Sequence, residues 1–253
     1  ALKAAHIGLA MGARGTDVAR EASAMVLTTD DFSAMVQAVE MGRRIFDNLR
    51  KAISYILAIH IPIAGMSLLP VLFQWPLILM PVHVAFLQLI IDPACSVVFE
   101  AEEPEAGIMR RPPRKPDEPL LNGRIWAACA LQGVSILAMV MGVYAWALHT
   151  NHTQGGSRAM AFIVLIFSNL ALIVANRSWS QGFLALLARP NRALRWVLPL
   201  ALLFLASAIL NPAAQKLFHF GRLQGHDLAI CALAGLLSIL WLDLLKRMAA
   251  RPE

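Results

Sequence analysis

Charged residues are scarce in this sequence. Only 15% of its 253 residues are Asp, Glu, Lys or Arg, whereas 58% are hydrophobic. A soluble domain is nearer a quarter charged and half apolar, so this balance indicates a lipid bilayer as the solvent. The net charge of +6 does not indicate nucleic-acid binding, because the arginines lie in short loops between apolar runs.

Cysteine is scarce as well. The three cysteines, Cys95, Cys129 and Cys231, each lie inside an apolar run and show no C-x-x-C spacing. This argues against a metal cluster and against a disulfide framework. No secretory signal opens the chain, and its first residue is Ala rather than Met. We therefore expect a piece of a longer protein.

Residues 1–50 differ from the rest because they are mixed, charged and rich in Gly and Ala. Their pattern predicts a short strand at 7–11, a helix at 16–24, a second strand at 24–27 and a helix at 32–49. Such a segment is too small to hold a core of its own. We interpret it as an incomplete α/β domain.

Six apolar stretches follow, each near the roughly 20 residues that a helix needs to cross the hydrocarbon layer. Backbone groups in lipid must be satisfied within the segment, so these stretches are predicted to be helices. The fold class is thus mainly α, a polytopic membrane protein with six transmembrane helices. The stretches are 52–73, 77–99, 125–148, 159–176, 194–211 and 228–245.

The distribution of basic residues predicts the orientation. Of 22 lysines and arginines, only Arg158, Lys216 and Arg222 fall outside the loops on the side of the two termini. The positive-inside rule then places both termini and the loops 100–124 and 177–195 in the cytoplasm of a multi-pass cell-membrane protein.

Asp92 lies deep in an apolar run and is followed directly by Pro93. A carboxylate there costs several kcal/mol unless it is paired or faces a polar cavity. Pro93 removes one N–H and frees the carbonyl of Leu89, and Gln88 lies one turn before Asp92. Hard cations bind such oxygen-rich pockets. The alternative is a proline kink whose aspartate bonds to a neighbouring helix.

The preceding span repeats this arrangement, because His60 lies close to Pro62, a helix-breaking residue that frees the carbonyl of Ala58. Two adjacent broken spans indicate a transport site near the midplane. Asn169 interrupts the fourth span and is either a site residue or a bond between helices. His60 has the same two interpretations.

Other polar residues have structural interpretations. His83 is predicted at the membrane interface, Gln132 between helices, and Asp243 in a local ion pair with Lys246. The loop 100–124 is either a solvated connector or docks against a cytoplasmic domain.

Three stretches carry a resemblance to a known family. They are ALKAAHIGLAMG at 1–12 with GTDVAREA at 15–22, GRRIFDNLRK at 42–51, and IMRRPPR at 108–114 with EPL at 118–120. In this order they resemble the C-terminal region of P-type cation ATPases, nearest to the calcium-pump-like branch.

The resemblance implies a domain organisation. Residues 1–42 would be the C-terminal remnant of an HAD-like phosphorylation domain, 43–51 a stalk, 52–248 membrane helices five to ten, and 249–253 a cytoplasmic tail. The family couples hydrolysis of ATP with Mg, through a phosphorylated aspartate, to cation movement. The implied partners are the lipid bilayer and the N-terminal cytoplasmic domains and helices one to four of the same protein, and nucleic acid is not among them.

The resemblance also implies a cation site. Asp92 matches the family's ion-binding aspartate of helix six, Gln88 an Asn one turn earlier, His60 an Asn of helix five, and Asn169 a Glu of helix eight.

The sequence departs from the family at carboxylate positions. A glutamate of helix five is Ile63 here, a threonine is Ile91, and Ala24 replaces an acidic residue. Asp92 alone remains of the carboxylates that a two-calcium site would use in these spans, so a single cation or a proton fits better.

The sequence contains no D-K-T-G-T motif and hence no phosphorylated aspartate. We expect that the chain alone does not hydrolyse ATP, because phosphoryl transfer needs nucleophile, metal ligands and substrate together. Two alternatives are a free-standing six-helix membrane subunit or pore, and a proton-coupled secondary transporter using Asp92 and His60.

Overall fold

The structure is a computed structural model that describes residues 1–114, 119–150, 152–179 and 181–249, without the side chains of 90–92, 94 and 242–249. The chain forms two compact units. One comprises Ala1–Asp47 with Glu103–Lys115, and the other Asn48–Glu102 with Pro116–Glu253. The long helix α2, Ser33–Leu72, contributes to both.

The first unit opens with a small strand–helix–strand arrangement. Strands β1, Leu9–Met11, and β2, Met25–Leu27, pair in parallel, with Ala10 opposite Val26. Parallel strands need a crossover connection, and helix α1, Asp17–Ala22, provides it. The strand, helix and strand predicted for this segment are therefore confirmed. A 3-10 turn, Leu2–Ala4, precedes them.

The loop between β1 and α1 is held by one carboxylate. Asp30, which adopts a left-handed backbone with φ of 52°, accepts hydrogen bonds from the N–H groups of Ala13 and Arg14, both at 2.9 Å. Gly12 is required in this loop, since a Cβ there would lie 2.7 Å from the carbonyl oxygen of Leu27.

The segment 103–115 packs on the first half of α2. Arg111 forms a 2.7 Å ion pair with Asp47, and Arg43 donates to the carbonyls of Ile108 and Arg111 at 2.7 and 2.8 Å. Ile108 is buried. Residues 109–114 of the loop 100–124 are exposed, as a solvated connector would be, yet Arg111 and two of the loop's carbonyls also bond to α2. Docking of the loop against a cytoplasmic domain stays a prediction.

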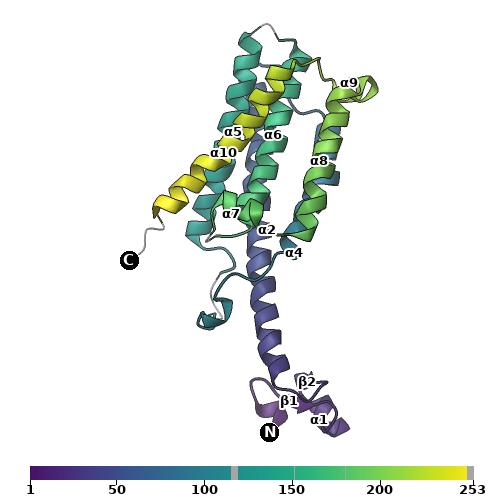
Figure 1. Cartoon of the computed structure of the whole chain (residues 1–253), viewed down its shortest axis with the longest axis vertical. Helices are drawn as coiled ribbons and strands as arrows, with labels where there is room; N and C mark the ends of the chain where they lie inside the picture. Colours follow the sequence, from purple (N-terminus) through teal and green to yellow (C-terminus); the bar gives the residue numbers. More distant parts are fainter. Residues whose placement is uncertain (115–118, 151, 180, 250–253) are drawn as a thin grey trace. The chain divides into compact units, whose positions relative to one another are not determined.

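The second unit is a bundle of helices (Figure 1). After α2, a helix runs from 81 to 100 as α3, Pro81–Phe86, a π-helical segment, Leu87–Ile91, and α4, Asp92–Glu100. The remaining long helices are α5, Gly123–His149, α6, Gln154–Asn176, α8, Arg192–Leu210, and α10, Gly225–Ala249. The short helices α7, Phe183–Ala188, and α9, Pro212–Phe218, lie between them.

Helix α6 forms the centre of this bundle. Almost all of its residues are buried, and α5 and α10 pack against it. The close approach of α10 to α6 depends on Gly235, where a Cβ would lie 2.5 Å from Phe167 Cβ, and that of α5 to α2 depends on Gly133, where a Cβ would lie 2.5 Å from the carbonyl oxygen of Ala58. Gln132 and Asn176 exchange hydrogen bonds of 3.3 and 3.4 Å between α5 and α6, which confirms the predicted role of Gln132.

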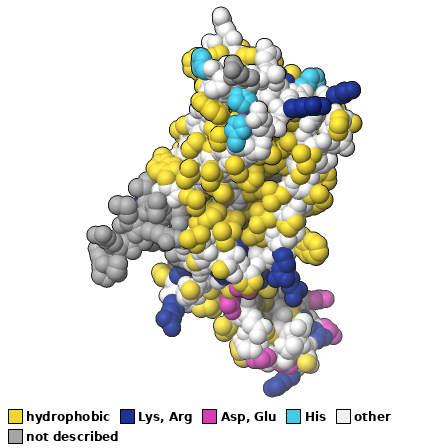
Figure 2. Space-filling view, turned by 45° about the horizontal axis from the view of Figure 1, so that its top comes forward, with side chains coloured by type: hydrophobic (Ala, Val, Ile, Leu, Met, Phe, Trp, Pro, Cys, Tyr) yellow, Lys and Arg dark blue, Asp and Glu magenta, His cyan; other side chains and the backbone are white. Residues whose placement is uncertain are grey.

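Four helices of the described part, α2, α5, α6 and α8, are long and apolar enough to cross a membrane. Helix α10 is apolar over Gly225–Trp241, the part of it whose side chains the structure describes, and the helix 81–100 changes type along its length. Hydrophobic side chains cover the face of this unit seen in Figure 2. The prediction of a mainly helical membrane protein is confirmed, whereas the count of six spans stays a prediction.

Candidate cation site

The helix 81–100 changes its hydrogen-bond pattern immediately before Asp92 and Pro93. Residues Leu87–Ile91 are π-helical, and an α-helix resumes at Asp92. A proline at position 93 has no N–H for the carbonyl of Leu89 and its ring crowds that carbonyl, so a wider turn relieves the conflict. Single π turns within α-helices occur frequently at functional sites.

The depth of this turn relative to α6 is fixed, because the segment 77–102 is hydrogen-bonded to the segment 158–177 at both ends. At one end Arg158 Nε donates to the carbonyl of Leu77 at 3.1 Å. At the other end Arg177 Nε donates to Glu102 Oε2 at 2.7 Å. The segments therefore run parallel, and Asn169, eight residues before Arg177, lies near the level of Asp92, ten residues before Glu102.

Ring contacts show that the helix 81–100 lies beside both α6 and α2. Phe86 meets Phe162 of α6 with ring centroids 5.6 Å apart. Near the other end, Phe99 meets Tyr55 of α2 at 5.8 Å. The turn that carries Asp92 is thus on a helix that contacts the two helices bearing Asn169 and His60.

Asn169 is fully buried, with 0% of its surface exposed. Neither its Nδ2 nor its Oδ1 has a hydrogen-bond partner among the residues that the structure describes. A buried polar group without a partner costs about 1–3 kcal/mol, so such an amide calls for an explanation. The side chain of Asp92, the predicted partner in the site, lies outside the described part.

The other predicted site residues do not gather in a buried cluster within this chain. His60 is exposed, and its Nδ1 lies 2.7 Å from the carbonyl oxygen of Ile56 in its own helix. Gln88 is exposed, and Leu89 is 78% exposed. Ala58 is buried where α5 approaches at Gly133.

Helix α2 continues through Pro62 and Pro70 to Leu72. The expectation that Pro62 breaks this span therefore differs from the structure, which has one continuous helix there. Proline lacks an N–H, so the hydrogen bond that Ala58 would otherwise receive from position 62 is still lost. Pro93, by contrast, directly follows a change of helix type.

Sequence reasoning missed a buried ionic cluster at the end of the bundle where helix 81–100 ends. Glu102 and Arg177 are 1% and 0% exposed. Besides Glu102, the Arg177 guanidinium donates to the carbonyls of Leu186 and Arg189, at 2.6 and 3.1 Å. The cluster thereby joins helix 81–100, α6 and the segment around α7.

Two asparagines extend this cluster. Asn191 Nδ2 donates to Glu102 Oε2 at 2.9 Å and to the carbonyl of Val98 at 3.1 Å. Asn48 Nδ2 donates to the backbone carbonyl of Glu102 at 3.0 Å. Glu102 is one of several glutamates in its stretch, and no sequence pattern distinguishes it from Glu100 or Glu103, both of which are exposed.

His83, predicted at the membrane interface, lies in the first turn of α3, and its depth in the membrane stays a prediction. It is fully buried among Phe162, Phe218 and Phe220, with ring centroids 5.0 to 5.5 Å away. Its Nδ1 accepts a hydrogen bond from the N–H of Met80 at 2.8 Å. The ring therefore belongs to the packing between α3, α6 and α9.

The three cysteines are buried, and none of them forms a disulfide in the part of the chain that the structure describes. Among the described residues, no group of three or more His, Cys, Asp or Glu side chains is arranged to hold a metal ion. The ion pair predicted between Asp243 and Lys246 falls on side chains outside the described part.

Comparison with known proteins identifies the family. The family described as "Cation transporting ATPase, C-terminus" matches residues 76–248. The chain belongs to the cation-transporting ATPases. This confirms the resemblance seen in the motifs of the first 120 residues and extends it over the helical unit.

Several curated members of the family are similar to the chain. It is 34% identical to the cation-transporting ATPase pma1 of a Synechocystis strain over 73% of its length, and 32% identical to the calcium-transporting ATPase of Bacillus subtilis over 87%. It is 29% identical to calcium-transporting ATPase 1 of Bacillus cereus over 97%. The chain spans only 20 to 29% of the length of these ATPases.

Proposed function

We propose that the chain is the membrane part of an ATP-driven cation pump that binds one cation, a divalent ion such as calcium or a proton, near mid-membrane. The observation that carries this proposal is the buried amide of Asn169 without a partner, at the level of the π-helical turn before Asp92. A membrane carboxylate and a buried amide at one depth provide oxygen ligands in a medium that otherwise lacks them.

The remaining ligands would come from helix 81–100 near Pro93 and from α2 near Pro62. The carbonyl of Leu89, freed by Pro93, lies one turn before Asp92, and Pro62 deprives the carbonyl of Ala58 of its usual donor. His60 and Gln88 are exposed in this chain, so in the complete protein they would face helices contributed by other parts of it. Because the site has one carboxylate, its negative charge neutralises a single cation better than two divalent ions.

The proposal extends to the first unit. Residues 1–42 would be the remnant of an HAD-like phosphorylation domain, 43–51 a stalk, 52–248 six spans, and 249–253 a tail. The small parallel strand–helix–strand unit supports an α/β origin. ATP and Mg would bind domains outside this chain, so the chain alone would not hydrolyse ATP, and both its termini would be cytoplasmic.

The test uses the complete pump purified in detergent. Asp92→Asn is expected to abolish cation-dependent phosphorylation by ATP, because the site loses its only carboxylate. Glu100→Gln is the matched control, since Glu100 is exposed on the same helix two turns later, and it should retain activity. Normal cation-activated turnover in Asp92→Asn would overturn the assignment, and transport without ATP in the unchanged protein would favour a secondary transporter.

A further inference from the structure

A long stretch of the sequence contains no acidic residue. Between Glu118 and Asp227 there is no Asp or Glu, yet Arg158, Lys216 and Arg222 fall there. These three residues are also the exceptions to the charge distribution that predicts orientation. The structure brings all three to one pocket.

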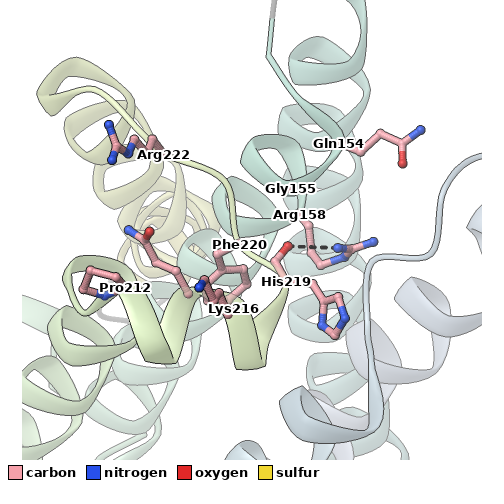
Figure 3. Close-up of a pocket in the computed structure, with 9 residues that line it drawn as sticks. Gln154, Gly155, Arg158, Pro212, Lys216, His219, Phe220 and Arg222 are labelled. Atoms are coloured by element: carbon pink, nitrogen blue, oxygen red, sulfur yellow. Dashed lines mark hydrogen bonds between the residues drawn. The ribbon is translucent and has the colours of Figure 1, made fainter.

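This basic pocket has a volume of about 590 Å³ and opens to the surface. It lies between the first turns of α6, helix α9 and the loop that follows α9 (Figure 3). None of its nine lining residues, all of which the structure describes, is acidic. They are Gln154, Gly155, Arg158, Pro212, Gln215, Lys216, His219, Phe220 and Arg222.

The backbone around the pocket is fixed by close contacts. A Cβ at Gly155 would lie 2.7 Å from the amide nitrogen of Gly221, and one at Gly221 would lie 2.6 Å from that of Gly156. The loop after α9 therefore crosses the start of α6 at a distance that only glycine allows. This crossing holds Gly221 against the first turn of α6, and Arg222 follows it directly in the chain.

Arg158 forms the floor of the pocket. It is 8% exposed, and its guanidinium donates to two carbonyls, Nη1 to His219 at 2.9 Å (Figure 3, dashed line) and Nε to Leu77 at 3.1 Å. Carbonyls orient a guanidinium but do not neutralise it. Lys216 and Arg222 are exposed, and the described residues place no carboxylate in an ion pair with any of the three. The pocket thus has a fixed positive charge suited to a phosphate group.

An apolar groove lies next to this pocket. It has a volume of about 380 Å³, and its lining residues from α6, α8 and α10 are all hydrophobic. Ile209 and Leu210 line the groove, whereas Pro212 and Gln215, just beyond the end of α8, line the basic pocket. The Gln215 side chain bonds to the carbonyl of Ile209, which joins the two walls.

We propose that the basic pocket binds the phosphate group of an anionic phospholipid whose acyl chain lies in the apolar groove. Free phosphate would fit the pocket, but it would leave the groove without a role. On the cytoplasmic side of membranes, basic pockets between helices bind anionic lipid headgroups, and the same charge attraction would act at this pocket. This inference does not depend on the proposed cation site.

The test measures the binding of defined lipids to the complete protein in detergent by native mass spectrometry. Dioleoyl-phosphatidylglycerol is expected to bind more tightly than dioleoyl-phosphatidylcholine. The double variant Lys216→Gln/Arg222→Gln should weaken phosphatidylglycerol binding by about tenfold or more, because each basic residue near an anionic headgroup contributes appreciably. The matched control Arg192→Gln/Arg195→Gln removes two exposed cations from the start of α8 and should leave the affinity unchanged.

A second variant separates lipid from free phosphate. Ala232→Leu fills the groove without touching the basic pocket, and it should weaken phosphatidylglycerol binding but not competition by inorganic phosphate. Unchanged lipid affinity in Lys216→Gln/Arg222→Gln would overturn the proposal. So would inorganic phosphate that binds as tightly as the lipid while Ala232→Leu has no effect.

Discussion

Two buried polar regions lie on the same pair of helices but differ in how their hydrogen bonds are satisfied. At the end of helix 81–100, both oxygens of Glu102 accept from Arg177, and Asn191 adds a further bond. At the level of Asp92, the amide of Asn169 is equally buried, yet both of its polar atoms lack a partner among the described residues.

This difference separates a structural role from a functional one. A satisfied buried network fixes the positions of the helices that contribute to it. A buried amide without a partner lowers stability unless something else binds it, so its retention is explained when a ligand supplies the missing contacts. On this view the cluster around Glu102 holds α6 and the segment that ends helix 81–100 in register, with Asn169 near the level of the Asp92 turn.

The largest expected effect is at the satisfied cluster. Arg177→Ala should destabilise the protein by up to about 3–5 kcal/mol, because the buried carboxylate of Glu102 loses its nearer cation and keeps only Arg189, whose Nε is 3.6 Å from Oε1. Thermal unfolding in detergent measures this loss. Arg192→Ala, at an exposed position, is the control and should change stability by less than about 0.5 kcal/mol.

A double variant sharpens this test. Glu102→Leu/Arg177→Met removes both charges, so it should be clearly more stable than Arg177→Ala alone. Equal losses for Arg177→Ala and Arg192→Ala would show that the cluster does not fix the helices.

A smaller effect is expected where α5 packs on α2. Gly133→Ala would place a Cβ 2.5 Å from the carbonyl oxygen of Ala58 and 2.7 Å from Ile61 Cβ, so we expect a loss of about 1–3 kcal/mol. Gly142→Ala on the same helix meets nothing within 4 Å and should stabilise the protein by about 0.5–1 kcal/mol. The two variants are compared by thermal unfolding, and a loss of the same size in both would contradict the close packing.

Asn169→Leu tests the unsatisfied region directly. Replacing the amide with an apolar group of similar size should raise the stability of the cation-free protein by about 1 kcal/mol. The same change should weaken cation activation of the complete pump at least about tenfold, because an oxygen ligand is lost. A variant with lower stability and unchanged activation would show that the amide has a structural partner instead.

The sequence predicted the parts of this fold that depend on local pattern. The strand–helix–strand order in the first unit, the apolar helices and the contact made by Gln132 follow from periodicity and from the cost of an unpaired amide in lipid. The continuous helix at Pro62 was not predicted, because neighbouring packing decides whether a proline ends a membrane helix.

Other features depend on tertiary contacts and had no local signal. Glu102 and Glu103 are adjacent acidic residues, yet Glu102 is buried against Arg177 and Glu103 is exposed. The buried position of His83 likewise depends on Phe218 and Phe220, which come more than a hundred residues later. For the candidate site, Asn169 was identified from its polarity within a span, but its lack of a partner required the structure.

The smallest expected effect is at the water-exposed start of α2, in contrast to the buried regions. The side-chain and backbone hydrogen bonds that Ser33 donates lower the pKa of Asp31 below its ordinary 3.8. A lowered pKa in the folded state means that this contact stabilises above the ordinary pKa and is lost as pH falls through the lowered value. Ser33→Ala should raise the pKa of Asp31 towards 3.8, measured by carboxyl NMR titration, with Asp17, which has no Ser33 contact, as the internal control. An unchanged pKa of Asp31 in this variant would show that the hydrogen bond from the Ser33 hydroxyl, the larger of the two causes, is not the origin of the shift. Because this contact is exposed to water, its loss should change the stability of the protein far less than the loss of a contact in the buried cluster around Glu102.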